Sequence, residues 1–464
     1  MRTRRKEGLT KAVSEMPMRI RKAFKEWEHA PDHLQERGVR IEVQIEAIEP
    51  LAWLRAQPFP QQTYWAPREN EAIWAGVGVC HELTQGSVEH PEEIFQRSRE
   101  VLKAFGTKKP HYIGGFSFTG QSIEETPWPE MGTCRFWIPF AEVRTTEDGC
   151  ILACNLYFRR NVETTLQRCL DQWKSVVAAT VASQPLPTLM FRRDHPEQAG
   201  WESNVLAALE LIENGVLDKV VLARKAEYTF ASEVTAAKIL GVLENLTSTC
   251  YHFLIQPNHG AAFMGTTPER LYRREGNELK TEALAGTRPL MGDPEEDARL
   301  GQELLTEDKE RREQELVRKE LIRQLHLLAD HLDAEETPQL LKLERKQHLL
   351  SKLSATLRSG VSDAEILKAL HPTPAVGGAP RANALRELAR LEPFSRGWYA
   401  APVGVIGEDF TEFAVAIRSG LVTDRKVNIY SGAGIVAGSD PAAEWEEIEN
   451  KIVDFVTVTS GRIR

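Results

Sequence analysis

Short apolar runs with strand-like alternation recur along the whole chain, and helical patterns separate them at irregular intervals. In the first half, the runs cover residues 39–48, 72–80, 111–118, 134–143 and 150–158, and a helical pattern covers residues 90–105. The runs lie too far apart for a simple meander and too irregularly for eight regular strand–helix–strand units. Strands and helices mixed without strict alternation predict an α+β fold, with sheets large enough to stack on each other.

The second half shows the same mixture more clearly. An amphipathic helix is predicted at residues 201–218, because Val205, Ala208, Leu209 and Ile212 share one face at i, i+3, i+4 and i+7 spacing. Further strands are predicted at residues 219–224, 251–257, 261–267, 270–276, 278–284, 397–407, 412–423 and 426–436. We expect a charged helical region over residues 300–350 and a last helix over residues 441–459.

No internal repeat and no low-complexity linker divides the 464 residues. We therefore expect a single domain over residues 36–464, preceded by a disordered tail and a lead-in helix within residues 1–35.

Composition and charge exclude several classes of protein. No run of about 18 apolar residues occurs, so no membrane span is predicted. The net charge of −9 argues against a general nucleic-acid-binding protein, because such proteins are normally basic. The six cysteines lack CxxC spacing and are predicted to be reduced thiols, and the basic N-terminus has no apolar core for a secretory signal. These features predict a cytoplasmic protein.

Two stretches carry candidate groups for proton transfer. In KVVLAR, Lys219 opens an apolar strand, where it is either a solvated strand end or, in a closed cleft, a base that loses its proton readily. In TTPERL, Pro268 favours an extended conformation at Thr267, and Glu269 follows. Glu269 is either an edge-strand carboxylate or, if it is buried, a general acid with a raised pKa.

Paired carboxylates mark two of the predicted helices. Glu310 and Glu313 are three residues apart and share a helical face, and Glu444 and Glu447 repeat this spacing with Lys451 four residues further on. Each pair is either a solvated helix face or one half of a site for Mg²⁺, which binds few carboxylates and keeps several waters.

The stretch SGAGIV, residues 431–436, follows a predicted strand. Gly432 and Gly434 begin like a dinucleotide-binding GxGxxG motif, but position 437 is alanine. The spacing disfavours a dinucleotide site and leaves a glycine turn whose backbone N–H groups face an anion.

Taken together and in this order, eight motifs resemble the chorismate-utilising enzymes. They are KVVLAR, TTPERL, TEALAGTRP, TEDKERREQELV, LHPTPAVGG, FAVAIRSG, SGAGIV and EWEEIENK, within residues 200–460, and TYWAP, AGVGV and GGFSF match more loosely in the first half. The resemblance implies two large antiparallel sheets stacked as a sandwich and wrapped by helices. It also implies a Mg²⁺-dependent reaction on chorismate, a cyclohexadiene that carries two carboxylates.

The resemblance further implies how the site is built. Glu313 and Glu447 would bind Mg²⁺ directly, and Glu310 and Glu444 would lie behind them and orient bound waters. The substrate would be held by Ala285, Gly286, Thr287, His371, Arg418, Gly432, Ala433, Gly434 and Lys451. An acidic protein can bind a dianion where a metal, cationic side chains and amides converge on one dry pocket.

Two positions distinguish reactions within the resemblance. Family members that use ammonia tend to carry glutamine at the position of Lys219, whereas those that add water carry lysine. Aminodeoxychorismate synthases commonly carry lysine where this chain has Ala285. Lys219 therefore implies that water adds at C2 while Glu269 protonates the departing C4 hydroxyl, which gives isochorismate for menaquinone or siderophore biosynthesis.

Other reactions of the same family stay open or are disfavoured. Salicylate synthase, which goes on to eliminate pyruvate, shares these residues and stays open. An anthranilate-type synthase is disfavoured by Lys219, so no glutamine amidotransferase partner is expected.

Overall fold

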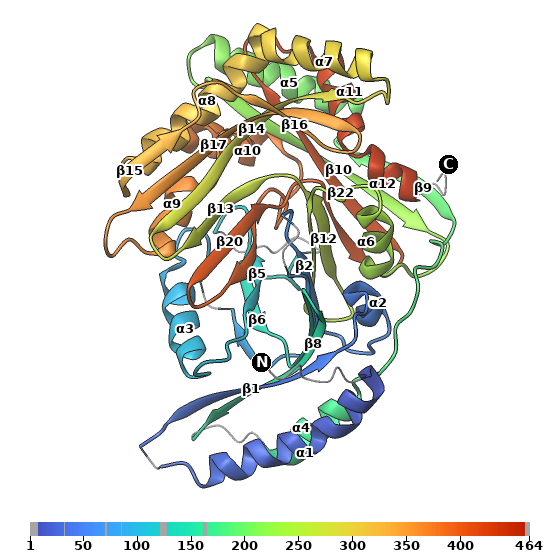
Figure 1. The fold of residues 1–464 in the computed structure, drawn as a ribbon. Helices are drawn as coiled ribbons and strands as arrows, with labels where there is room; N and C mark the ends of the chain where they lie inside the picture. Colours follow the sequence, from blue (N-terminus) through green and yellow to red (C-terminus); the bar gives the residue numbers. More distant parts are fainter. Residues whose placement is uncertain are drawn as a thin grey trace.

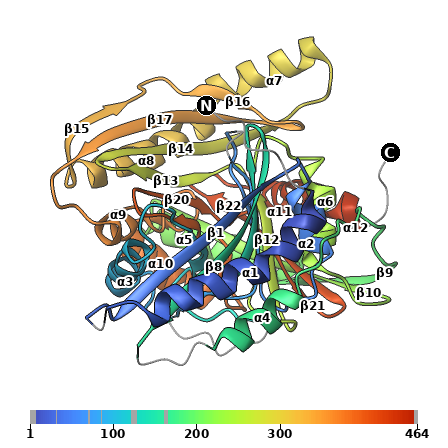
Figure 2. The ribbon, with the colours of Figure 1, turned by 60° about the horizontal axis from the view of Figure 1, so that its bottom comes forward.

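Two large antiparallel sheets form the body of the protein in the computed structural model, which describes residues 8–31, 33–69, 72–84, 86–120, 128–160 and 165–459. Within these residues one sheet has 12 strands and the other has 10, and all their strand pairs are antiparallel. Figures 1 and 2 show the sheets from two directions, with helices on their outer sides.

The 12-stranded sheet contains strands from both halves of the chain. Its order is β1 (Glu36–Ile45), β8 (Gly149–Arg159), β7 (Ala141–Thr146), β3 (Trp74–Val77), β2 (Gln62–Ala66), β11 (Tyr251–Gln256), β12 (Ala262–Thr267), β21 (Ser419–Thr423), β22 (Lys426–Ile435), β10 (Lys219–Phe230) and β18 (Gly378–Ala379), with β9 (Leu189–His195) also paired to β10.

The 10-stranded sheet is likewise assembled from distant segments. Its order is β15 (Ala329–Ala334), β17 (Lys346–Leu357), β14 (Glu278–Pro289), β13 (Arg270–Glu275), β20 (Phe410–Val415), β19 (Pro402–Ile406), β5 (Tyr112–Phe116), β6 (Cys134–Ile138) and β4 (His81–Leu83), with β16 (Gln339–Lys342) also paired to β17. In each sheet a block of strands from residues 36–159 joins a block from residues 189–435, through the β2–β11 pair in the 12-stranded sheet and the β5–β19 pair in the 10-stranded sheet.

Twelve helices lie in the described residues. They are α1 (Leu9–Glu28), α2 (Pro50–Arg55), α3 (Glu92–Lys103), α4 (Leu166–Lys174), α5 (Gln198–Glu213), α6 (Ala236–Glu244), α7 (Pro294–Thr306), α8 (Asp308–Leu325), α9 (Asp363–Leu370), α10 (Arg381–Leu391), α11 (Pro441–Lys451) and α12 (Val453–Thr459). In the part of the chain that the structure describes, none of them is both long enough and apolar enough to cross a membrane.

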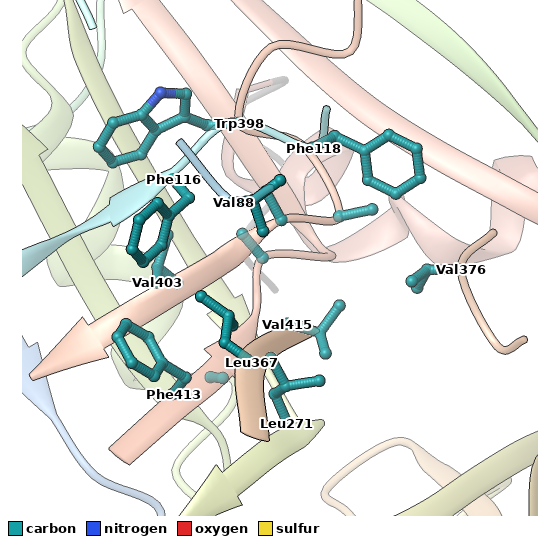
Figure 3. Close-up of a cluster of buried hydrophobic side chains, with 14 of the residues drawn as sticks. Val88, Phe116, Phe118, Leu271, Leu367, Val376, Trp398, Val403, Phe413 and Val415 are labelled. Carbon is teal, nitrogen blue, oxygen red and sulfur yellow. The ribbon is translucent and has the colours of Figure 1, made fainter. Parts of the chain in front are cut away.

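The larger hydrophobic core joins the facing sides of the two sheets. It contains Phe253 and Phe263 of the 12-stranded sheet together with Phe116 and Phe413 of the 10-stranded sheet. Figure 3 shows part of this core, where Leu367 of α9 lies among side chains of the 10-stranded sheet. The predicted α+β fold with two large stacked antiparallel sheets is confirmed.

A second core lies on the other face of the 12-stranded sheet, beneath α1, α2, α4 and α6. Helix α1 buries Ala12, Met16, Ile20 and Phe24 in it, one face at helical spacing. The lead-in helix expected within residues 1–35 is α1, and it already begins at Leu9, where a disordered tail was expected, because this apolar stripe is buried against the sheet. Residues 1–7 of the predicted tail lie outside the described residues.

The prediction of a helical region over residues 300–350 is correct for α7 and α8 and wrong beyond Leu325. Residues 329–357 form β15, β16 and β17 instead, and β17 pairs along its length with β14. Leu353, Ala355 and Leu357 are buried at every second position, which is the alternation of a half-buried strand. The charged residues nearby obscured this alternation.

Two of the places where the chain crosses between the sheets lie next to each other. Strand β12 ends at Thr267 in one sheet and β13 begins at Arg270 in the other, so Glu269 lies in the crossing. Strands β20 and β21 cross back around Arg418. The backbone N–H of Val415 donates to the Glu269 carbonyl at 3.0 Å, and that of Thr266 donates to the Arg418 carbonyl at 3.0 Å. The two crossings are therefore held together, with Glu269 and Arg418 beside each other.

Candidate active site

A cavity lies beside the two crossings and collects most of the residues that the sequence singles out. Its wall contains Glu269, Ala285, Gly286, Thr287, Glu310, Glu313, Arg418, Gly432, Glu447 and Lys451. It is completed by Val221, Pro268, Leu284, Lys309, His348, Ala375, Val376, Tyr399, Ala400, Ile417, Tyr430 and Ser431. Segments spread from residue 221 to residue 451 thus meet at one place.

Lys219 reaches the edge of this cavity from the first position of β10. Its side chain is fully buried, and its Nζ donates to Oε1 of Glu313 at 2.8 Å. An added Cβ at Gly434 would lie 2.8 Å from Lys219 Cε and 2.9 Å from Glu313 Oε1, so only glycine leaves room for this pair. Lys219 is therefore a buried amine against the cavity wall, and the interpretation as a solvated strand end is excluded.

Each of the four predicted metal-site carboxylates is paired with a cation. The pairs are Glu310–Arg288 at 3.0 Å, Glu313–Lys219 at 2.8 Å, Glu444–Lys309 at 2.9 Å and Glu447–Lys451 at 2.6 Å. Lys451 also donates to the carbonyl of Gly432 at 2.9 Å. Helices α8 and α11 thus face each other across alternating charges, and neither acidic face is freely solvated.

A bulge in β14 forms one wall of the cavity at Ala285–Gly286–Thr287. The register against β17 shifts between Ala285 and Thr287, which leaves Gly286 as the extra residue, with φ +71°. An added Cβ at Gly286 would lie 2.7 Å from Glu310 Oε2. Glycine is needed here for two reasons, because the φ value disfavours other residues and because Glu310 is close.

His348 of β17 links this bulge to Arg418. The Arg418 guanidinium donates to His348 Nε2 at 2.8 Å, and His348 Nδ1 lies 3.0 Å from the Gly286 carbonyl and 3.0 Å from Thr287 Oγ1. Since Nε2 accepts, Nδ1 carries the hydrogen and donates to the bulge. Burial and the neighbouring Arg418 lower the pKa of His348 well below its usual value, so the ring is neutral.

Arg418 is held in an unusual backbone conformation. Its φ is +48°, in the left-handed region that residues other than glycine seldom adopt. Such strain persists only where the surrounding structure imposes it, and it occurs often at functional sites. The strained crossing aims the guanidinium into the cavity wall.

His371, expected in the pocket, is not in the cavity wall that the described residues form. It ends α9, and its Nε2 lies 2.9 Å from the Phe118 carbonyl. Burial lowers the pKa of His371 to about 3, so this ring is a neutral packing residue. The histidine that does line the cavity is His348.

The stretch SGAGIV differs from the expected glycine turn. Residues Gly432, Ala433 and Gly434 continue β22 and pair with β10, and only Gly432 of the three lines the cavity. An added Cβ at Gly432 would lie 2.7 Å from the Leu222 carbonyl and 3.1 Å from the Tyr399 hydroxyl. The glycines therefore serve close packing in a strand, and the Ala433 side chain is in the core.

Glu269 has the electrostatics expected of an acid that stays protonated at neutral pH. Burial raises the pKa of Glu269 to about 8, and the negative charge of Glu282 adds to the increase. Lys219, Lys451 and Arg418 oppose it without cancelling it. The carboxyl group can thus donate a proton into the cavity.

The carboxylates of α8 and α11 repel one another mainly within each helix. Burial and the charge of Glu313 raise the pKa of Glu310, and burial and the charge of Glu447 raise that of Glu444. Burial also disfavours the ionised form of Glu447, but Lys451, Lys309 and Lys219 outweigh it and lower the pKa of Glu447.

This donor set fits a hard cation. Oε2 of Glu444 is buried without a hydrogen-bond partner in the described part of the chain, and Glu310, Glu313 and Glu447 line the cavity. Among the described residues no three His, Cys, Asp or Glu side chains already form a metal-binding group. Mg²⁺ does not require one, since it usually takes one or two carboxylates and keeps its waters.

The cavity residues that the sequence did not predict include Lys309, His348 and Tyr399. His348 lies within the stretch taken for a helix, and reading that stretch as a strand would have placed His348 on a defined face. Lys309 directly precedes Glu310, and nothing in the sequence distinguishes it from an ordinary surface lysine. No sequence signal distinguishes Tyr399 from other buried aromatic residues.

Comparison with known proteins accounts for this arrangement. The family model described as "Chorismate binding enzyme" matches residues 23–459. The chain belongs to the chorismate binding enzyme family. The resemblance that the eight motifs indicated is confirmed, and the match extends through the first half of the chain, where the motifs were weaker.

Curated relatives within this family span most of the chain. Isochorismate synthase MenF of Escherichia coli is 34% identical over 89% of this chain and 91% of its own length. MenF of Haemophilus influenzae is 32% identical over 90% and 91%. The salicylate biosynthesis isochorismate synthase of Pseudomonas aeruginosa is 39% identical over 88% and 87%.

Solved structures of family members share the fold. MenF, the menaquinone-specific isochorismate synthase from Escherichia coli, has a TM-score of 0.80 and 31% identity, covering 98% of this chain and all of its own. Anthranilate synthase component I from Streptococcus pneumoniae has a TM-score of 0.64 at 20% identity, covering 85% of this chain and 90% of its own, which shows a shared fold only.

Proposed function

We propose that this chain is an isochorismate synthase, which converts chorismate to isochorismate by adding water at C2 and losing the C4 hydroxyl. The family membership and the three isochorismate synthase relatives support the activity. The observation that carries the assignment in this chain is that a buried lysine and a protonated acid both lie at one cavity. Lys219 lies against the wall and Glu269 within it, and the pKa of Glu269 is about 8.

Lys219 is the proposed base. Its buried Nζ removes a proton from the water that attacks C2, which requires the uncharged amine. The same Nζ lies 2.8 Å from Glu313 Oε1. Weakening this ion pair frees the amine, so Glu313 links the state of the metal site to the base.

Glu269 is the proposed acid. It is protonated at neutral pH, and it gives its proton to the departing C4 hydroxyl while the ring double bonds shift. Water supplies the incoming oxygen, the C4 oxygen leaves as water, and the net change is an isomerisation.

Positively charged groups and the bulge are proposed to hold the two substrate carboxylates. Arg418 and Lys451 line the cavity together with Gly286 and Thr287. The neutral His348 keeps Arg418 and the bulge in place. Because the binding charges are concentrated at one buried place, the acidic net charge of the protein does not prevent the binding of a dianion.

Mg²⁺ is the proposed cofactor, held by Glu313 and Glu447 with Glu310 and Glu444 behind them. When bound, it supplies positive charge that neutralises a substrate carboxylate and the facing glutamates. The structural support is the unpartnered oxygen of Glu444, together with Glu310, Glu313 and Glu447 in the cavity wall.

The biological setting is proposed on the same grounds. Isochorismate would feed menaquinone or siderophore biosynthesis, and no glutamine amidotransferase partner is needed because water is the nucleophile. A cytoplasmic location agrees with the free thiols of all six cysteines.

Chromatography of the products formed from chorismate, with and without Mg²⁺, tests the proposal. We expect isochorismate as the product and only with Mg²⁺. Salicylate and pyruvate from chorismate and Mg²⁺ alone would instead identify a salicylate synthase. An aromatic amine formed on addition of ammonium would identify an anthranilate-type synthase.

A further inference from the structure

Two hydrogen bonds hold the backbone on either side of Glu269. Arg68 Nη1 donates to the Pro268 carbonyl at 2.6 Å, immediately before Glu269. The backbone N–H of Arg270, immediately after it, donates to Glu282 Oε1 at 3.0 Å. The peptide that carries the proposed acid is thus held at both ends by side chains from elsewhere in the chain.

The two holding side chains also bind each other. Arg68 donates to both carboxylate oxygens of Glu282, at 2.7 and 2.8 Å, in the bidentate geometry that gives strong, directional ion pairs. Arg68 follows β2 of the 12-stranded sheet, and Glu282 belongs to β14 of the 10-stranded sheet. The pair therefore spans the two sheets at the point where Glu269 crosses between them, and Glu282 is 5% exposed.

Glu282 is the negative charge among the groups that act on Glu269. The positive groups are Lys219 of β10, Lys451 of α11 and Arg418 of the second crossing, and the Tyr399 hydroxyl is also near. The positive groups favour ionisation of Glu269, whereas Glu282 and burial oppose it. Because Glu269 must stay protonated to donate its proton, the negative charge of Glu282 favours the form that the reaction needs.

We propose that Arg68 and Glu282 form a clip that positions Glu269 for proton donation. This inference rests on the isochorismate synthase function proposed above. The clip has two effects. Arg68 fixes the backbone that carries Glu269, and the charge of Glu282 keeps the Glu269 carboxyl group protonated. Arg68 and Glu282 do not line the cavity, so both are positioning residues.

Substitution Glu282→Gln separates the two effects. Glutamine keeps an oxygen for the Arg270 N–H but removes the charge, so Glu269 should ionise more readily. The pH at which kcat falls on the alkaline side should move down by roughly one unit, about a tenfold change in acid constant. Substitution Arg68→Lys keeps the Glu282 charge but cannot make the bidentate bonds, so kcat should fall severalfold without movement of that limb.

Infrared titration measures the protonation of Glu269 without reference to activity. The carboxylic acid C=O band that disappears in Glu269→Gln should titrate in the unsubstituted protein near pH 8 and at lower pH in Glu282→Gln. If the band shifts in Glu282→Gln but the unsubstituted protein makes no isochorismate, the clip is supported and the proposed function is rejected. An unshifted band with normal isochorismate formation would reject the clip alone.

A matched control comes from the 12-stranded sheet. Glu142 is a buried carboxylate that accepts hydrogen bonds from Nη1 and Nη2 of Arg40, and neither residue lines the cavity. Glu142→Gln should leave the alkaline limb in place, so an equal shift in Glu142→Gln and Glu282→Gln would overturn the proposal. If Glu282→Gln does not fold, the double substitution Arg68→Gln/Glu282→Gln removes the guanidinium together with its carboxylate partner. The Glu269 band of this variant should still titrate at lower pH than in the unsubstituted protein.

Discussion

The proposed mechanism needs Glu269 protonated and Lys219 uncharged, and both groups lie at one buried site. Glu269 is kept protonated by burial and by Glu282. Lys219 is fully buried beside Glu313. The chemistry therefore depends on the exact groups at these two positions, and substitutions there should affect the rate far more than the fold.

Replacing the proposed base should nearly abolish activity. Lys219→Ala is expected to lower kcat by about 10²–10⁴-fold, the usual contribution of a positioned proton-transfer group. Isochorismate formation measured by chromatography gives the rate. Lys280→Ala, at an exposed position of β14, serves as the control and should keep full activity. Substantial activity in Lys219→Ala would assign the base to another group.

The pH dependence of the rate should report the acid. Because Glu269 acts in its protonated form and its pKa is about 8, kcat should fall on the alkaline side as the pH rises through that value. The measurement is kcat over about pH 6 to pH 10. A rate that keeps rising past pH 9 or so would contradict a protonated Glu269.

The free energy of unfolding should also depend on the protonation of Glu269. The pKa of Glu269 is raised from 4.5 to about 8 in the folded state, so its contribution to stability is complete below the unfolded value and is lost as the pH rises toward 8. Each pH unit in that window removes up to about 1.4 kcal/mol. Glu269→Gln lacks this loss. Its gain in free energy of unfolding over the unsubstituted protein should grow between pH 5 and 8 or so, measured by denaturant titration. A gain that does not change with pH would contradict the assignment.

At the level of elements, the bulge in β14 joins the substrate wall to the acidic helix α8. Gly286 combines a positive φ with an approach to Glu310 that leaves no space for a side chain. His348 of β17 bonds the same bulge and Arg418. A change at Gly286 should therefore disturb the substrate wall and the carboxylate cluster together.

Gly286→Ala should destabilise the protein by about 1–3 kcal/mol and reduce activity, because it adds both backbone strain and a clash with Glu310. Gly276→Ala is the matched control. Gly276 has a similar φ of +58°, but an added Cβ there meets nothing within 4 Å. It should therefore lose stability through strain alone and keep its activity. Thermal unfolding and kcat for both variants give the comparison, and equal loss of activity would show that the approach to Glu310 is unimportant.

Individual elements were predicted well from the sequence where the spacing of the apolar residues and the length of the run indicated the same type of element. Strands such as β10 and β12 are recognisable from short apolar runs with flanking turn residues, and α5 is recognisable from its helical spacing. Strand β17 was hidden because its polar residues and the charged helix before it suggested one continuous helix. His348 was missed for the same reason, since a residue has no predictable face until the element is known.

At the level of the whole molecule, the site depends on two helices from distant parts of the chain. Helices α8 and α11 bring Glu313 and Glu447 to one cavity, each paired with a lysine. No spacing rule within either helix could show that the two would meet. The order of the motifs indicated it only because proteins that share this order share the fold.

Mg²⁺ should bind to the folded protein and stabilise it. Binding to the folded state alone raises the free energy of unfolding by about 2.7 kcal/mol at a hundredfold excess over Kd. Thermal unfolding with and without MgCl₂ measures the effect. Glu313→Ala should abolish it, whereas Glu315→Ala, which changes a solvent-facing partner of Arg318 and Lys319 on the same helix, should keep it. An equal response in both variants would place Mg²⁺ elsewhere.

Incubation of the protein with chorismate and Mg²⁺ in H₂¹⁸O, followed by mass spectrometry of the product, tests the central claim most directly. If Lys219 activates water and Glu269 expels the C4 hydroxyl, isochorismate should carry one ¹⁸O atom, located at C2. Isochorismate without the label, or a different product from chorismate, would contradict the account.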